Sequence, residues 1–179
     1  MDAFTTRGVK IMNRTKLAAG VLLVGGLAVV LALRGTAPSA EPEVTRLADA
    51  GTAIHVYKTE TCGCCALWVE HMEAAGFEVT VENLSNSDLT ALKRRHGIAV
   101  ELESCHTALA GGYVLEGHIP AEVVRSFLEA APEVKGITVP GMPIGSPGME
   151  VEGVDPWPYD VIAFDGKGNR TVFRHIAPR

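Results

Sequence analysis

The residues of this chain best suited to redox or metal chemistry are its four cysteines, and three of them are almost adjacent. Cys62, Cys64 and Cys65 share one short motif, and Cys105 lies far downstream. The thiolate is the form of cysteine that attacks disulfides and binds metals, and the N–H groups at the start of a helix stabilise it. Clustered thiolates repel one another unless a disulfide removes two charges or a cation lies among them. Soft sulfur ligands select Cu(I), with zinc as a weaker alternative.

Three interpretations of the cysteines compete. They could form structural disulfides, as exported proteins often do. Cys62 and Cys65 have C-x-x-C spacing and could form a redox pair. The extra thiol of Cys64 argues against simple redox chemistry, because it invites misdirected disulfides. We therefore favour a metal-binding protein with a multinuclear Cu(I)–thiolate cluster and no catalytic residue. A thiol-disulfide oxidoreductase or a copper redox enzyme remains the alternative.

Histidine and methionine side chains accompany the cysteines. His106 is the next residue after Cys105, and His118 lies at the far end of the same predicted hairpin. Imidazole binds both copper states and zinc, and the methionine thioether prefers Cu(I). Two methionines lie in a constrained Gly/Pro-rich loop, where packing alone does not explain them, so ligation is a candidate role. The predicted metal ligands are Cys62, Cys64, Cys65, Cys105, His106, His118, Met142 and Met149.

The residue pattern predicts an α/β fold that brings these ligands together. A strand that leads into a cysteine motif at a helix N-terminus, within a βαβ unit, is the thioredoxin arrangement. The loop before the strand at 107–110 should then face the C-x-x-C motif. The residues 136–148 show no strand or helix period. The expected elements are strands at 53–57, 77–81, 107–110, 113–116, 159–164 and 171–173, and helices at 64–75, from Ser87 or Asn86 to Arg95, and from Pro120.

The fold class is thus a thioredoxin-like domain with an appended Gly/Pro-rich loop and a C-terminal β-hairpin, preceded by an N-terminal hydrophobic helix. Residues 17–33 carry no charge and come after several basic residues. This layout is typical of a secretory signal or an uncleaved anchor. Either one would place the C-terminal domain on the far side of the membrane, outside the cytoplasm. We divide the chain into 1–34, a signal peptide or N-terminal membrane anchor; 35–50, a linker; and 51–179, the metal-binding domain.

The charge distribution excludes one class of partner. The whole chain has a net charge of −5, and the N-terminal segment is basic, so the exported part is more acidic than that value. An acidic domain repels phosphate backbones, so nucleic acid is not expected as a partner.

Four motifs in this order resemble the CopG-type copper-resistance proteins, long catalogued as a domain of unknown function with predicted metal binding. The resemblance covers about 51–173. The motifs are Tyr57-Lys58 with Cys62-Gly63-Cys64-Cys65 and Trp68; Ser104-Cys105-His106-Thr107; Glu116-Gly117-His118-Ile119-Pro120; and Pro140-Gly141-Met142-Pro143 with Gly145-Ser146-Pro147-Gly148-Met149-Glu150.

The resemblance implies a bacterial periplasmic protein with a thioredoxin-like fold. It also implies a copper cluster held by cysteine, with histidine and methionine help, and a role in copper resistance. The partners expected are copper ions, copper-efflux or copper-chaperone proteins, and the inner membrane if the N-terminal segment stays uncleaved.

Overall fold

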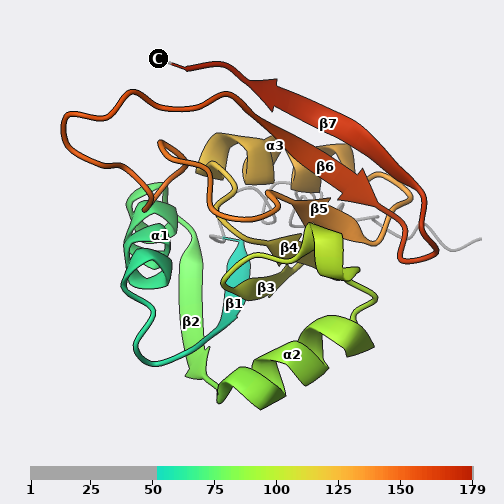
Figure 1. The fold of residues 1–179 in the computed structure, drawn as a ribbon. Coiled ribbons are helices and arrows are strands. Elements are labelled where there is room, and N and C mark those ends of the chain that lie inside the picture. Colours follow the sequence, from blue (N-terminus) through green and yellow to red (C-terminus); the bar gives the residue numbers. More distant parts are fainter. Residues whose placement is uncertain (1–51, 179) are drawn as a thin grey trace, which may run out of the picture. The chain divides into compact units, whose positions relative to one another are not determined.

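The structure, a computed structural model, describes residues 52–178 (Figure 1). The predicted signal or anchor at 1–34 and the predicted linker at 35–50 lie outside the described residues, so their assignments stay predictions. Within the described part, no helix has the length and apolarity needed to cross a membrane.

The described residues form a mixed α/β fold. Its strands are β1 Ala53–Lys58, β2 Glu78–Asn83, β3 Thr107–Ala110, β4 Tyr113–Glu116, β5 Gly136–Thr138, β6 Tyr159–Phe164 and β7 Arg170–Ile176. Its α-helices are α1 Gly63–Ala74, α2 Asn86–Arg95 and α3 Ala121–Ala130, and a short 3-10 helix, η2, spans Val100–Leu102.

All strands join one sheet in the order β2-β1-β3-β4-β5-β6-β7. Strands β1 and β2 are parallel because α1 carries the chain back across the sheet between them. Strands β3 and β4 form an antiparallel hairpin. Gly111 and Gly112 make its turn with φ of 56° and 85°, values that glycine adopts without the cost of a Cβ.

Side chains alternate between the two faces of the sheet, as strand geometry requires. Leu115 belongs to the main core with α1 and α3 residues such as Trp68 and Phe127. Its neighbour Val114 packs on the opposite face with Leu102 of η2. Met72 is fully buried on the α1 stripe, as its helical spacing predicts.

Two expectations about the elements were wrong. The segment 136–148 is not all loop, since Gly136–Thr138 forms β5, which pairs parallel with β4 and antiparallel with β6. The C-terminal hairpin is therefore continuous with the sheet and not an appendage. Three residues are too few to show a period. Helix α2 is capped by Ser85, whose side chain accepts from the Asp88 N–H, and not by Asn86 or Ser87.

Candidate metal centre

The first cysteine segment lies between β1 and α1. Cys62 is the N-cap residue of α1, in an extended conformation, and no side chain caps the helix there. Cys64 and Cys65 occupy the first turn, where helix N–H groups lack intrahelical acceptors. Cys65 is fully buried beside Trp68, whose indole N–H donates to the Ile119 carbonyl at 2.9 Å. The buried side chains of Cys65 and Trp68 thus anchor the motif to the core.

The second segment is carried by the ends of the β3–β4 hairpin. Thr107 pairs with Glu116 in the hairpin register, so the residues just before β3 lie beside those just after β4. This places Cys105 and His106 next to His118, as the sequence predicts. The Gly117 N–H donates to the His106 carbonyl at 3.1 Å and closes the arrangement.

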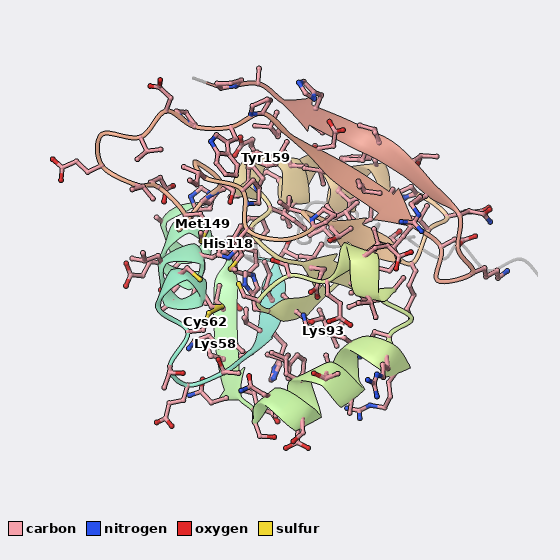
Figure 2. All side chains as sticks on the ribbon, viewed as in Figure 1. Lys58, Cys62, Lys93, His118, Met149 and Tyr159 are labelled. Atoms are coloured by element: carbon pink, nitrogen blue, oxygen red, sulfur yellow. A yellow bond between two sulfur atoms is a disulfide. The ribbon has the colours of Figure 1, made fainter. Side chains whose placement is uncertain are left out.

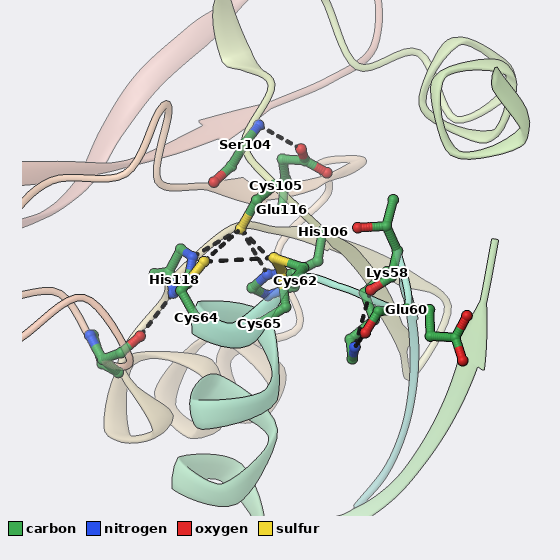
Figure 3. The surroundings of a disulfide bond; sticks show 12 residues. Lys58, Glu60, Cys62, Cys64, Cys65, Ser104, Cys105, His106, Glu116 and His118 are labelled. Carbon is green, nitrogen blue, oxygen red and sulfur yellow. Dashed lines mark hydrogen bonds between the residues drawn. A yellow bond between two sulfur atoms is a disulfide. The ribbon is translucent and has the colours of Figure 1, made fainter. Parts of the chain in front are cut away.

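The four sulfur atoms converge (Figure 3). Cys62 and Cys65 are joined by a disulfide, whereas Cys64 and Cys105 are free. The Cys105 Sγ lies 3.2 Å from the Cys65 Sγ and 3.9 Å from the Cys64 Sγ, and the Cys62 and Cys64 sulfurs are 3.5 Å apart. One donor atom from each cysteine falls within 4.8 Å of the others, a spacing that suits a metal ion.

Cys105 is the junction of two donor groups. Its sulfur belongs to the cysteine cluster and also to a group with His106 and His118, whose donor atoms lie within 4.8 Å of one another. Burial, together with the charge and hydrogen bond of Cys64, raises the pKa of the Cys105 thiol to about 12. The sequence predicts clustered thiolates that need a cation among them. The raised pKa means instead that, without a metal, Cys105 is a neutral thiol near neutral pH.

The His118 ring is oriented as a metal ligand would be. Its Nδ1 lies 2.7 Å from the Pro147 carbonyl, which can only accept, so Nδ1 carries the proton. Burial lowers the pKa of His118, which favours the neutral ring. The lone pair is then on Nε2, 2.8 Å from the Cys105 Sγ. Metal-binding histidines commonly donate their other ring N–H to such a carbonyl.

The His106 ring is held differently. It is fully buried, with its centroid 4.4 Å from that of Trp68, and its Nδ1 lies 3.4 Å from the Cys105 Sγ. Its Nε2 has no hydrogen-bond partner in the described part of the chain. Burial above all, with nearby positive charge, lowers its pKa well below the ordinary value, so the ring is neutral.

The two predicted methionine ligands lie on the loop that covers the first turn of α1. Gly148 approaches α1 so closely that a Cβ there would lie 2.6 Å from the Cys64 carbonyl oxygen. Met149 therefore comes directly after a backbone that touches the cysteine motif, and Figure 2 shows it on the same side as His118. Met142 is half exposed. Ligation by Met142 and Met149 stays a prediction, as it does for the cysteines and histidines.

A buried ion pair beneath Cys105 was missed by sequence reasoning. Lys93 of α2 and Glu116 of β4 pair through Nζ and Oε1, and both are almost fully buried. Glu116 also accepts from the Thr107 hydroxyl and, at 2.6 Å, from the Ser104 N–H. The pair thus fixes the backbone next to Cys105. Lys93 stands among the basic residues in the last turn of α2, and no sequence signal marks it as buried.

A second buried lysine precedes the first cysteine segment. Lys58 ends β1 and is 8% exposed. Its Nζ donates to the Thr59 carbonyl at 3.0 Å and the Glu60 carbonyl at 3.5 Å. Lys58 occurs in the first sequence motif, but nothing in the sequence marks it as buried.

Comparisons with known proteins agree with this site. The family model described as "Protein of unknown function, DUF411" matches residues 102–149, which include Cys105, both site histidines and both predicted methionines. A solved structure titled "Copper resistance protein copG- Form 2" is 38% identical, with a TM-score of 0.65, over 71% of this chain and 99% of that one. The Form 1 structure is also 38% identical, with a TM-score of 0.65. That match covers 70% of this chain and 98% of the Form 1 chain. No curated protein matches.

The chain belongs to the CopG-type copper-resistance family. The predicted family resemblance is thereby confirmed. The match to the CopG structures spans nearly their whole length, and its extent agrees with the described domain. Membership in the CopG family, together with the converging cysteine and histidine donors, supports a copper-related function.

Proposed function

We propose that this protein is a periplasmic copper-binding protein that holds Cu(I) for copper resistance or homeostasis. The observation that carries the proposal is the convergence of two donor groups that share Cys105: four sulfurs in one, and the Cys105 sulfur with two imidazoles in the other, each within 4.8 Å. Thiolate and imidazole are the donors that Cu(I) prefers, whereas hard cations prefer oxygen. No carboxylate belongs to the donor groups of the described residues.

The disulfide gives the site two forms. With Cys62 and Cys65 joined, the free sulfur donors are Cys64 and Cys105, and His118 Nε2 lies beside them. Two electrons and two protons from a thiol reductant convert the disulfide to two thiols, and four sulfur donors are then free. More sulfurs than one Cu(I) ion needs favour a multinuclear cluster. His106, Met142 and Met149 complete the proposed ligand set.

The proposed fold and location rest on the same segments. The parallel β1-α1-β2 unit, with the cysteine motif at the start of α1, supports a thioredoxin-like assignment. The basic and apolar N-terminal sequence supports export to the periplasm, either free or anchored to the inner membrane. Copper-efflux or copper-chaperone proteins are the proposed exchange partners.

Elemental analysis of anaerobically purified, reduced protein tests the proposal, with X-ray absorption to separate sulfur from nitrogen ligands. We expect Cu(I) bound mainly by sulfur. Replacement of Cys64 by Ser should lower the copper stoichiometry and leave the fold unchanged, because Cys64 is partly exposed and free. The same copper content in Cys64→Ser and unaltered protein would exclude Cys64 as a ligand. A reduced protein that binds no Cu(I) at all would refute the function.

A thiol-disulfide oxidoreductase is the second candidate, and the Cys62–Cys65 disulfide at the start of α1 favours it. In that reaction one thiolate of the pair attacks a substrate disulfide, and the other resolves the mixed disulfide. An insulin-reduction assay on metal-free protein separates the two functions. Turnover without copper, combined with failure to bind Cu(I), would favour the enzyme.

A further inference from the structure

Lys58 is a buried cation without an acidic partner. It is 8% exposed, and both acceptors of its ammonium group are neutral backbone carbonyls, those of Thr59 and Glu60. Throughout residues 52–178, no carboxylate lies within ion-pair distance of its Nζ. Burial of a charge costs free energy unless an opposite charge offsets it. The described part of the fold does not supply that charge.

Lys58 is linked through one backbone carbonyl to the start of the cysteine motif. The Thr59 carbonyl oxygen accepts from the Lys58 Nζ at 3.0 Å and from the Cys62 N–H at 3.2 Å, so a single oxygen atom separates the ammonium group from the backbone of the first cysteine. In Figure 3 Lys58 lies on the Cys62 side of the site, apart from the sulfur atoms. After burial and the charges of His118 and Lys93, the charge of Lys58 also contributes to the lowered pKa of His106.

The proposed cargo creates the missing negative charge. When two cysteine thiols bind one Cu(I), they release two protons, and the copper–dithiolate unit carries one net negative charge. Cys64 and Cys105 are two such thiols in the form with the disulfide. Each further Cu(I) that binds to thiolates already formed adds positive charge. A fixed cation beside the site therefore favours the first copper ion and not the last.

We propose that Lys58 is the counter-cation of the copper–thiolate centre and strengthens binding of the first Cu(I) ion. This inference rests on the proposed function and adds a determinant that is not itself a ligand. Lys93 differs in having an ion-pair partner, Glu116, although its charge also favours the Cys105 thiolate.

The test compares three variants in anaerobic competition titrations against a chromophoric Cu(I) chelator. Lys58→Met removes the charge and keeps the apolar stem, whereas Lys58→Arg keeps the charge. Lys167→Met is the matched control, since it removes one exposed charge from the β6–β7 turn. At an effective dielectric constant of about 20, two unit charges about 12 Å apart still interact strongly enough for roughly a tenfold effect.

We expect Lys58→Met to weaken binding of the first Cu(I) about tenfold, with the total copper at saturation unchanged. Lys58→Arg and Lys167→Met should match the unaltered protein. The difference should persist at high salt, because buried charges are screened less than exposed ones.

Several outcomes would overturn the inference. They are equal first-ion affinity in Lys58→Met and unaltered protein, loss of affinity in Lys58→Arg equal to that in Lys58→Met, and loss of the metal-free circular dichroism spectrum in Lys58→Met. The last two would mean that Lys58 acts through hydrogen bonds or packing rather than charge. If the unaltered protein itself takes no copper from the chelator, the proposed function fails and this inference falls with it, a result distinct from all three.

Discussion

The two cysteine-bearing segments are held in place by different forces. The segment with Cys105 is fixed by an internal ion pair, Lys93 with Glu116, which also binds the Ser104 N–H. The segment with Cys62 has a buried lysine too, but Lys58 contacts only backbone carbonyls. Glu116 neutralises Lys93, whereas Lys58 has no acidic partner among the described residues.

The two lysines are therefore expected to have different roles, Lys93 in folding stability and Lys58 in copper binding. Removal of one member of a neutralised pair leaves a buried charge without a partner, so the damage falls on folding. Removal of an unneutralised charge leaves no opposite charge unpaired, so the main loss falls on binding of whatever the charge attracts. Two residues of the same type, both beside the metal centre, are thus expected to show opposite balances between stability and copper affinity.

The largest expected effect is that of Glu116→Leu on the second segment. It leaves the Lys93 ammonium buried and removes the acceptor of the Ser104 N–H. The free energy of unfolding should fall by about 3–5 kcal/mol, measured by urea denaturation of metal-free protein. The double variant Lys93→Met, Glu116→Leu should recover much of this loss. A single variant as stable as the unaltered protein would show that the ion pair does not fix this segment.

A smaller effect is expected for Gly148→Ala, which disturbs the first segment. Gly148 has φ of +82°, and an added Cβ would lie 2.6 Å from the Cys64 carbonyl oxygen and 2.9 Å from the Trp68 nitrogen. Gly141→Ala is the matched control, since its φ is +68° and a Cβ there meets nothing within 4 Å. Both changes carry a left-handed backbone cost of roughly 1–2 kcal/mol.

Only Gly148→Ala should also weaken copper binding, because it pushes the loop away from α1 and withdraws the Pro147 carbonyl from His118. Thermal unfolding and a Cu(I) competition titration measure the two effects. Equal copper affinity in the two alanine variants would show that this loop does not orient His118.

The smallest effect is a pH dependence of stability that arises at His106. Burial holds its pKa in the folded protein well below 6.5, the ordinary value expected for the unfolded chain. As the pH falls below 6.5, the unfolded chain binds a proton that the folded ring does not, so stability decreases. The slope contributed is at most about 1.4 kcal/mol per pH unit.

Denaturant titrations of metal-free protein between about pH 6.5 and about pH 5 would detect this slope. Replacement of His106 by Phe should flatten it, while the pKa of His118, also lowered by burial, leaves a residual dependence. An unchanged slope in His106→Phe would show that the folded and unfolded states protonate His106 alike, and would contradict the lowered pKa.

Sequence patterns predicted most of the elements that build the site. The β3–β4 hairpin has the predicted bounds, because Gly111-Gly112 permits only a tight turn there. Strand β5 was not predicted, because its three residues are extended only through their pairing with β4 and β6 on either side. Tertiary pairing, not local preference, makes that segment a strand.

Sequence reasoning predicted the proximity of the candidate donors better than it predicted their surroundings. Cysteine and histidine spacing was enough to bring Cys105 and His118 to the motif, since hairpin ends must meet. The burial of Lys58 and Lys93 could not be predicted, because lysine is rarely interior and its helix or strand position does not reveal a distant partner such as Glu116. The Cys62–Cys65 pairing was one of several that spacing allowed.

That disulfide links residues only three positions apart in sequence. A cross-link lowers the chain entropy of the unfolded state less as the ring it closes becomes smaller. A bond from Cys65 to Cys105 would close a much longer ring, whereas the observed bond restrains barely one turn of helix. The rest of the domain hardly depends on it, so the bond can open and close as a local event while the surrounding architecture stays assembled.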